Sequence, residues 1–177
     1  MTQTPLVRFR APERSDIPTF LVWFNDPEVT DGLTTFPFLS TEAEEAWFDN
    51  MMKEPIDQRP LVIEALEGDD WQPIGTCALF GINWRYRCAE LGISIGDKRF
   101  WNRGYGTQAM RLLVEHGFSR LNLNRIYLRV HADNPRAIRC YEKVGFVHEG
   151  IQRQAVYKHS GYVDVWMMSV LRSEWPG

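Results

Sequence analysis

The sequence has few cysteines, no basic surplus and no long apolar run, and each shortage excludes a class of protein. Its three cysteines lack C-x-x-C spacing, which gives no zinc signature and predicts a protein of the reducing cytoplasm. The formal net charge of -3 does not favour a nucleic-acid partner, since such partners usually require a basic surplus. No apolar run approaches the roughly 18 residues of a membrane-spanning helix, and residues 1–16 lack a signal-peptide core. We therefore expect no metal, no nucleic acid and no membrane.

The remaining composition is that of an ordinary globular protein with many aromatic residues. A length of 177 residues predicts one domain over residues 1–177. With 44% hydrophobic and 24% charged residues, the composition argues against disorder. The seven Trp, ten Phe and six Tyr residues could build a core or line a pocket.

Hydrophobic periodicity and turn residues predict an α/β (α+β) chain in the order β-α-α-β-β-β-α-β-α-β-β. A capping box of Thr41 and Glu44 begins the second helix, and Asn25-Asp26-Pro27 ends the first, before a loop over 30–40. The predicted strands are 6–10, 61–66, 74–82, 88–95, 125–130, 145–151 and 163–171. The later helices are 104–121 and the short helix that Asn134-Pro135 begins and Gly145 ends.

The first segment with chemical meaning is Arg103-Gly104-Tyr105-Gly106-Thr107, which follows a predicted strand and opens a helix. Glycines allow the backbone to approach a ligand, and a helix N-terminus supplies free N–H groups and a positive dipole. Such a loop suits a pyrophosphate, although the same residues also make a tight strand-to-helix turn. The segment is neither a Walker loop nor a full G-x-G-x-x-G motif.

The second segment is residues 131–146, HADNPRAIRCYEKVGF. On a helix, Ala137, Ile138 and Tyr141 share one face because of their spacing. Taken alone, Tyr141 is a packed core tyrosine and Asn134 a helix cap. Cys140 lies about 100° from Tyr141 around the helix, so we interpret it as a buried structural cysteine and not as a nucleophile.

Together, residues 89–110 and 133–146 resemble the GNAT superfamily of acyl-CoA-dependent N-acetyltransferases. The similarity is greater to its branch of ribosomal-protein N-terminal acetyltransferases, and it extends from Val7 to Glu174. The resemblance implies a mixed, twisted sheet flanked by helices, with splayed central strands that hold acetyl-CoA between them. The cofactor-binding residues that it implies are Ile93, Ser94, Ile95, Arg99, Arg103, Gly104, Tyr105, Gly106, Thr107, Asn134, Arg136 and Tyr141.

One residue departs from the family pattern. Trp101 stands where the broad superfamily has Arg or Gln at the start of its phosphate loop. The branch that this chain resembles also carries Trp there, so the cofactor assignment is kept. Backbone N–H groups, helped by Lys98, Arg99 and Arg103, would then bind the phosphates.

The resemblance further implies direct transfer, in which an amine attacks the thioester carbonyl. Backbone N–H groups near Ser94 or Ile95 would stabilise the oxyanion. Tyr141 would protonate the leaving thiolate, because a phenol with a pKa near 10 stays protonated at neutral pH. Glu90 is the candidate general base, although it could instead be an ion-paired surface residue.

The acceptor is predicted from the cost of deprotonation. At pH 7 this costs roughly 4 kcal/mol for an amine of pKa about 10, but nearer 1.4 kcal/mol for an α-amine of pKa about 8. A site without a strong base therefore favours the α-amine of a protein or peptide. The candidate acceptor-binding residues are Trp23, Asp26, Phe36 and Trp84.

Other functions stay open. Residues 82–90 resemble the same segment of polyamine acetyltransferases, but Phe80-Gly81 lacks the acidic residue expected before it. Amino sugars and aminoglycosides are further acceptor classes. A non-catalytic acyl-CoA sensor is a different class of function, and Tyr141 argues against it because sensing needs no acid beside the sulfur. An interaction domain with a vestigial cleft is a third, and the state of assembly is monomer or homodimer.

Overall fold

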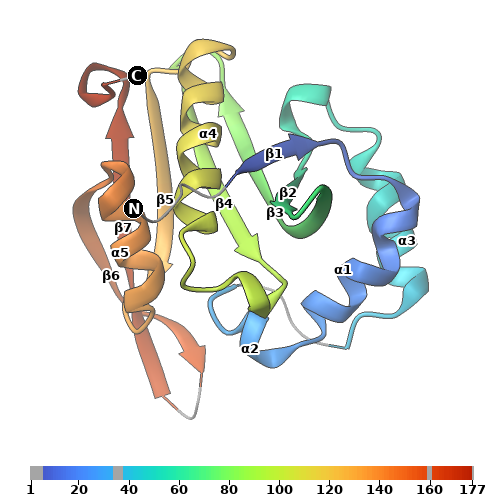
Figure 1. Ribbon diagram of the computed structural model, residues 1–177. Coiled ribbons are helices and arrows are strands. Elements are labelled where there is room, and N and C mark those ends of the chain that lie inside the picture. Colours follow the sequence, from blue (N-terminus) through green and yellow to red (C-terminus); the bar gives the residue numbers. More distant parts are fainter. Residues whose placement is uncertain (1–5, 34–37, 159–160, 177) are drawn as a thin grey trace.

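The computed structural model describes residues 6–33, 38–158 and 161–176, and their strands form a sheet in the order β1-β2-β3-β4-β5-β7-β6 (Figure 1). This mixed sheet with flanking helices confirms the predicted fold class. The strands are β1 Val7–Arg10, β2 Leu61–Glu67, β3 Asp70–Asn83, β4 Cys88–Ile95, β5 Arg125–His131, β6 Val147–Lys158 and β7 Gly161–Leu171. The helices are α1 Ile17–Phe24, α2 Pro27–Thr30, α3 Thr41–Met51, α4 Tyr105–Ser119 and α5 Pro135–Val144. Short 3-10 turns lie at η1 Arg14–Asp16, η2 Ile56–Gln58, η3 Lys98–Phe100 and η4 Arg172–Glu174.

Successive side chains of a strand point to opposite faces of the sheet, so β2 contributes to an apolar core on each face. Ile63 of β2 belongs to the main core, which α4 fills with Met110, Leu113 and other apolar residues. The preceding Val62 packs on the other face against Phe20 of α1. α4 and α5 thus cover one face of the sheet, and α1 covers part of the other.

β4 and β5 part within the sheet. These two parallel strands pair at Cys88–Arg125, Ala89–Ile126 and Glu90–Tyr127, and the described strands do not pair beyond Glu90. Figure 1 shows them diverging toward their C-terminal ends, where α2 and the tip of the β6–β7 hairpin also lie. The predicted splay of the fourth and fifth strands is therefore present, and it opens a wedge at this end of the molecule.

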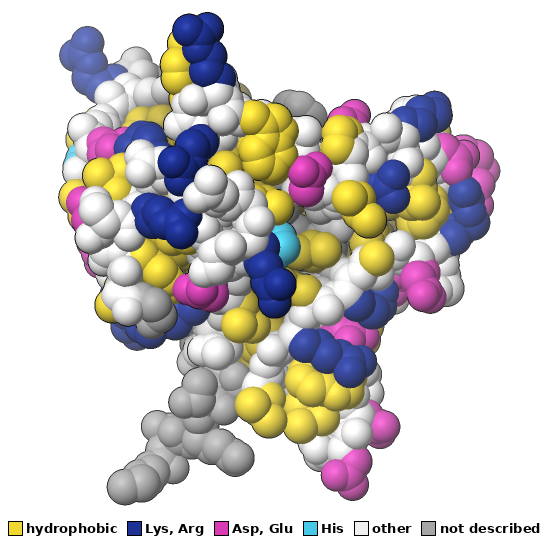
Figure 2. All heavy atoms as spheres, turned by 90° about the horizontal axis from the view of Figure 1, so that it is seen from above, with side chains coloured by type: hydrophobic (Ala, Val, Ile, Leu, Met, Phe, Trp, Pro, Cys, Tyr) yellow, Lys and Arg dark blue, Asp and Glu magenta, His cyan; other side chains and the backbone are white. Residues whose placement is uncertain are grey.

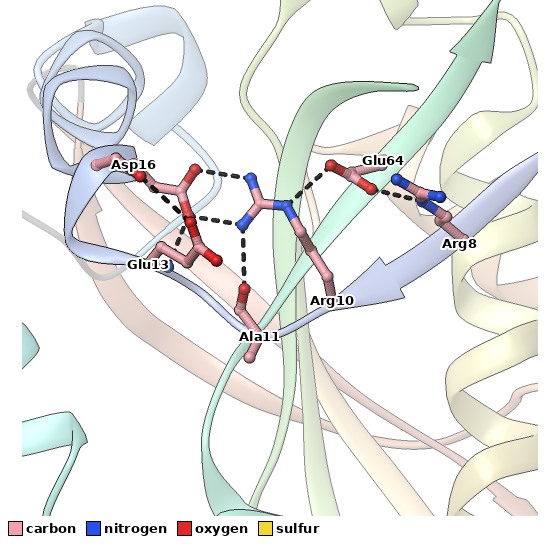
Figure 3. Close-up of polar contacts among 7 residues, drawn as sticks. Arg8, Arg10, Ala11, Glu13, Asp16 and Glu64 are labelled. Carbon is pink, nitrogen blue, oxygen red and sulfur yellow. Dashed lines mark hydrogen bonds and ion pairs between the residues drawn. The ribbon is translucent and has the colours of Figure 1, made fainter. Parts of the chain in front are cut away.

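A network of ion pairs joins the first strand to the helical layer (Figure 3). Arg10 donates two hydrogen bonds of 2.7 Å to the carboxylate of Asp16 and one of 2.8 Å to Glu64. Arg8 contacts the second oxygen of Glu64 at 2.6 Å. Because Arg8 and Arg10 are two residues apart on a strand, both reach the same carboxylate on β2. The network fixes β1 to β2 and to the start of α1.

Among the local predictions, one is incomplete and two are wrong. Asp26-Pro27 does not only end α1 but begins α2, because Asp26 accepts a hydrogen bond from the Glu28 N–H and proline suits the first turn. The cap of α3 is Ser40, which accepts from Ala43, instead of Thr41. β6 continues to Lys158, well past the predicted end at 151.

The described surface carries charges of both signs. On the face shown in Figure 2, Lys and Arg side chains lie between acidic and apolar ones instead of forming one basic area. None of the helices in the described part of the chain is long and apolar enough to cross a membrane. Within the described ranges, no group of three or more His, Cys, Asp or Glu side chains could hold a metal ion.

Candidate active site

A cavity of about 370 Å³ lies where β4 and β5 diverge. Its wall is formed by the end of β4, the start of α4, one face of α5, and the residues in and after α2. The predicted cofactor residues that the cavity brings together are Ile93, Ser94, Ile95, Gly104, Gly106, Thr107, Asn134, Arg136 and Tyr141. Segments that are far apart in the sequence therefore meet at one site.

The start of α4 is shaped as a cradle for an anion. Gly104 stands before the helix with a φ of 87°, a conformation that glycine adopts without strain. The first turn of this 15-residue helix leaves N–H groups without intrahelical acceptors, and the helix dipole makes this end positive. Because Gly104, Gly106 and Thr107 line the cavity, these donors lie at its wall. The arrangement fits a pyrophosphate.

Trp101 connects this loop to β4 and α5. Its indole N–H donates a hydrogen bond of 2.7 Å to the Ile95 carbonyl, which fixes the end of the strand. The Arg136 guanidinium lies over the indole ring, 3.7 Å from its centroid, as in a cation–π contact. The residue that departs from the broad family pattern thus positions a cationic side chain at the cavity.

Three predicted cofactor residues do not line the cavity. Arg99 is turned to Asp97, with 2.7 Å between guanidinium nitrogen and carboxylate oxygen. Arg103 lies against Phe100 and faces Glu67, although that contact is long at 3.8 Å. The Tyr105 ring is buried and meets Phe100 edge-on, with 5.0 Å between centroids. Ion pairing and core packing direct these three side chains away from the cavity. Pyrophosphate binding by the backbone N–H groups of Arg103 and Tyr105 stays a prediction.

α5 presents to the cavity both the phenol of Tyr141 and a basic stripe, which consists of Arg136, Arg139 and Lys143. Burial raises the pKa of Tyr141, so its hydroxyl stays protonated at neutral pH. Asn134 caps the helix by accepting a hydrogen bond of 3.1 Å from the Ala137 N–H, and it also lines the cavity. Cys140 lines the cavity too, where its sulfur lies 3.3 Å from the Thr107 hydroxyl. Burial raises the pKa of the Cys140 thiol, which favours the unreactive protonated form.

The Glu90 carboxylate forms an ion pair, whereas a general base would need a carboxylate that is free to accept a proton. Its carboxylate contacts the Arg129 guanidinium at 2.8 Å, and it lies outside the cavity lining. Glu90 is the last β4 residue that pairs with β5, and Arg129 follows just beyond that point on β5. The ion pair therefore spans the two strands where they begin to part.

The predicted acceptor residues are not brought together. Trp23 is buried in the α1 core, and the Trp84 side chain is exposed in the turn before β4, at the strand end opposite the cavity. Asp26 caps α2 and contacts the Lys98 ammonium at 2.6 Å. Phe36 lies outside the described residues. Core packing accounts for the place of Trp23 and an ion pair for that of Asp26, while Trp84 lies in a turn at the far end of the strand.

The cavity instead carries acidic residues that the sequence argument did not select. Glu28, Asp31 and Asp133 all line it. Asp31 and Asp133 both contact the ammonium of Lys158, at 2.8 and 3.0 Å. No local motif could identify these three acids, because they come from α2, the residue after it and the β5–α5 turn.

Comparison with known proteins agrees with this geometry. Residues 7–147 match the family model described as an acetyltransferase (GNAT) domain. The chain belongs to the GNAT acetyltransferase family. This confirms the resemblance seen in the sequence, and with it the assignment as an acetyl-CoA-dependent N-acetyltransferase. Acetyl-CoA is the co-substrate, and the glycine-rich start of α4 and the wedge between the strands suit its pyrophosphate and its arm.

GNAT relatives with different acceptors resemble this chain. A spermidine N(1)-acetyltransferase of Vibrio cholerae is 28% identical over 166 residues, which are 94% of this chain and 93% of the relative. A crystal structure of the Vibrio cholerae spermidine N-acetyltransferase with CoA and spermine has a TM-score of 0.88 and 27% identity, and the match covers 97% of this chain and 98% of that chain. YdaF of Bacillus subtilis, a candidate ribosomal N-acetyltransferase, is 32% identical over 103 residues, which are 58% of this chain and 56% of the relative.

Proposed function

We propose that this GNAT enzyme acetylates a primary amine of a small polycation, with polyamines such as spermidine as the substrate class. The polarity of the cavity carries the proposal. Arg136, Arg139 and Lys143 line it from one stripe of α5, while Glu28, Asp31 and Asp133 line it from α2 and the turn before α5. From Pro135 to Lys143, α5 rises roughly 12 Å along its axis.

These two ends suit the two substrates. A basic stripe attracts the phosphates of acetyl-CoA, and an acidic end attracts a polycation, because each site favours the opposite charge. The similarity to spermidine acetyltransferases over nearly the full chain supports the same acceptor class. A polyamine thus takes the place of the peptide α-amine that the sequence favours as acceptor.

The residues of this chain take the following roles in the proposal. Backbone N–H groups from Gly104 to Thr107 bind the pyrophosphate, and Arg136 adds positive charge there. The edge of β4 at Ile93 to Ile95 holds the pantetheine arm. Bound acetyl-CoA supplies the activated acyl group. Backbone N–H groups near Ser94 stabilise the developing oxyanion, and the protonated Tyr141 hydroxyl donates to the sulfur.

One observation favours a second acceptor class, the α-amine of a peptide. Because Arg129 holds Glu90, this carboxylate cannot take the amine proton without losing an ion pair. A site with a weak base suits an α-amine of pKa about 8 better than an amine of pKa about 10. A peptide N-terminus is therefore the alternative, and the similarity to YdaF agrees with it.

Acetyl-CoA turnover with a panel of acceptors tests both. The panel holds spermidine, spermine, peptides with free α-amines and no lysine, and glucosamine, and mass spectrometry identifies the acetylated product. We expect saturable transfer to the polyamines. Saturable turnover with peptides and none with polyamines would reject the proposal in favour of the alternative.

A further inference from the structure

The ammonium of Lys158 is held in a site that a free amine could also occupy. Its Nζ lies 2.8 Å from Oδ2 of Asp31, 3.1 Å from the Asp31 carbonyl oxygen and 3.0 Å from Oδ2 of Asp133. The side chain is only 11% exposed. Three oxygens from two segments thus surround one primary ammonium group, which has three hydrogens to donate.

The site belongs to the cavity wall. Asp31 and Asp133 both line the cavity, so their carboxylates are accessible from the space next to the cofactor cradle. Lys158, in contrast, arrives from the tip of the β6–β7 hairpin, far from both carboxylates in the sequence. Burial by itself would lower the pKa of Lys158, but the hydrogen bonds to both aspartates outweigh it and raise the pKa. The group is therefore a cation at neutral pH.

A buried histidine adjoins the same cluster. His131, at the end of β5, is 6% exposed, and its Nδ1 meets no hydrogen-bond partner among the described residues. Burial and then the positive Lys158 lower the pKa of His131, so the imidazole is neutral at pH 7. A buried polar atom without a partner is uncommon in native proteins. It indicates a polar partner that the described protein atoms do not supply at this place.

We propose that Asp31 and Asp133 form the ammonium subsite for the acceptor, and that Lys158 occupies this subsite until a cationic acceptor displaces it. The inference rests on the proposed function, because it gives one charged end of the acceptor a place beside the cavity. Lys158 presents the same chemical group as a polyamine. A tethered ammonium at the site lowers the apparent affinity of any free amine by the fraction of time that it occupies the carboxylates.

The alternative is that Lys158 only anchors the hairpin to the segment after α2. Both ideas predict lower stability when Lys158 is removed, because two carboxylates lose a partner. They differ in the affinity for a free amine. Competition predicts that the amine binds more tightly without Lys158, whereas an anchor predicts equal or weaker binding.

Calorimetric titration of spermidine into the full chain with saturating CoA measures this affinity without any turnover. The variants are Lys158→Met, Asp133→Asn and the double variant. Lys53→Met is the matched control, since it removes the same charge from an exposed position just after α3, where Lys53 contacts Asn50. Lys158→Arg keeps the cation and is the conservative control. Circular dichroism shows whether Lys158→Met folds, and Asp133→Asn serves as the second test if it does not.

The expected pattern is specific. Lys158→Met lowers the Kd for spermidine about tenfold, which corresponds to the loss of one competing partly desolvated ion pair. Lys53→Met and Lys158→Arg leave it within about twofold, and Asp133→Asn raises it about tenfold. In the Asp133→Asn background, the Lys158→Met change loses most of its effect, because the two residues act through one contact.

Equal or weaker spermidine binding in folded Lys158→Met overturns the inference, and so does an equal gain with and without Asp133. If Lys158→Met unfolds, Asp133→Asn with an unchanged Kd also overturns it. Acetyl transfer to spermidine, assayed on the same samples, separates the two claims. Turnover with no effect of Lys158 on binding leaves the proposed function standing alone. Binding with the expected pattern but without turnover supports the subsite and refutes the proposed function. Absence of both the binding pattern and turnover refutes both claims.

Discussion

Replacement of Arg10 by methionine tests how much the ion-pair network of Figure 3 contributes to the stability of the fold. The substitution removes two hydrogen bonds to Asp16 and one to Glu64. Glu64 keeps its contact with Arg8 at 2.6 Å, but Asp16 keeps only the Glu13 N–H at 2.8 Å among the described polar contacts. One largely buried carboxylate therefore loses its cation.

The magnitude follows from this geometry. Breaking a buried ion pair by removing one partner costs about 3–5 kcal/mol. The low end applies, because the Arg10 side chain is 29% exposed and Glu64 retains a partner. We expect the free energy of unfolding to fall by about 3 kcal/mol, which lowers the melting temperature of a chain of this size by about 9 °C. Urea titration followed by tryptophan fluorescence at pH 7 measures this change in the free energy of unfolding.

The loss depends on pH in a defined direction. Burial alone would raise the pKa of Asp16 and of Glu64, but the hydrogen bonds from Arg10 outweigh it and hold both pKa values below their ordinary range. Groups with a lowered folded pKa stabilise the fold above the unfolded pKa of about 4, and this stabilisation is lost as the pH falls through the folded value. The difference between wild type and Arg10→Met should therefore shrink below about pH 4.

Arg8→Met is the control for this reasoning. Arg8 is 50% exposed, and Glu64 keeps Arg10 when Arg8 is removed. The expected loss is about 1 kcal/mol, as for an exposed ion pair. A difference below 1 kcal/mol for Arg10→Met at pH 7, or one that stays constant down to pH 3, would refute the argument.

Two further predictions concern α5 and the end of β4. Tyr141→Phe should lower kcat about a hundredfold and leave the Kd for acetyl-CoA unchanged, because only the proposed proton donor is lost. Steady-state kinetics and titration of acetyl-CoA measure the two constants. An unchanged kcat would contradict the role of Tyr141 as proton donor. Gly96→Ala would place a Cβ 2.2 Å from the ring of Trp23, so the free energy of unfolding should fall by about 2 kcal/mol. Urea titration measures this free energy. Gly150→Ala is the control, because its added Cβ meets no atom within 4 Å, and equal stability of Gly96→Ala and wild type would show that α1 can move aside.

The sequence predicts the elements best where their own residues define them. β4 has the predicted bounds of 88–95, and α5 begins after the Asn134 cap and ends before Gly145. β6 was predicted too short because most of it is exposed, so its residues past 151 show no hydrophobic alternation. α2 was missed because Asp26-Pro27 serves both as the end of one helix and as the start of the next.

In the site, the residues on the cofactor side could be predicted from the sequence, whereas those on the acidic side could not. The cofactor side rests on two continuous segments, so nine predicted residues meet at the cavity. Arg99, Arg103 and Tyr105 do not, since sequence position does not show whether a side chain faces an ion-pair partner or the core. The acidic side could not be predicted, because Asp31, Asp133 and Lys158 come together only through the tertiary fold.

The divergence of β4 and β5 gives the molecule a sheet edge in its interior. An exposed edge usually invites pairing with another chain, and proteins cover or charge such edges to avoid aggregation. Here the free edge of β4 faces the cavity, with α5 and the segment after α2 forming the rest of the wall. An extended ligand with amide groups can pair with this edge inside the cavity. The free edge of β4 therefore lies within the molecule, beside α5, and not at the outer margin of the sheet.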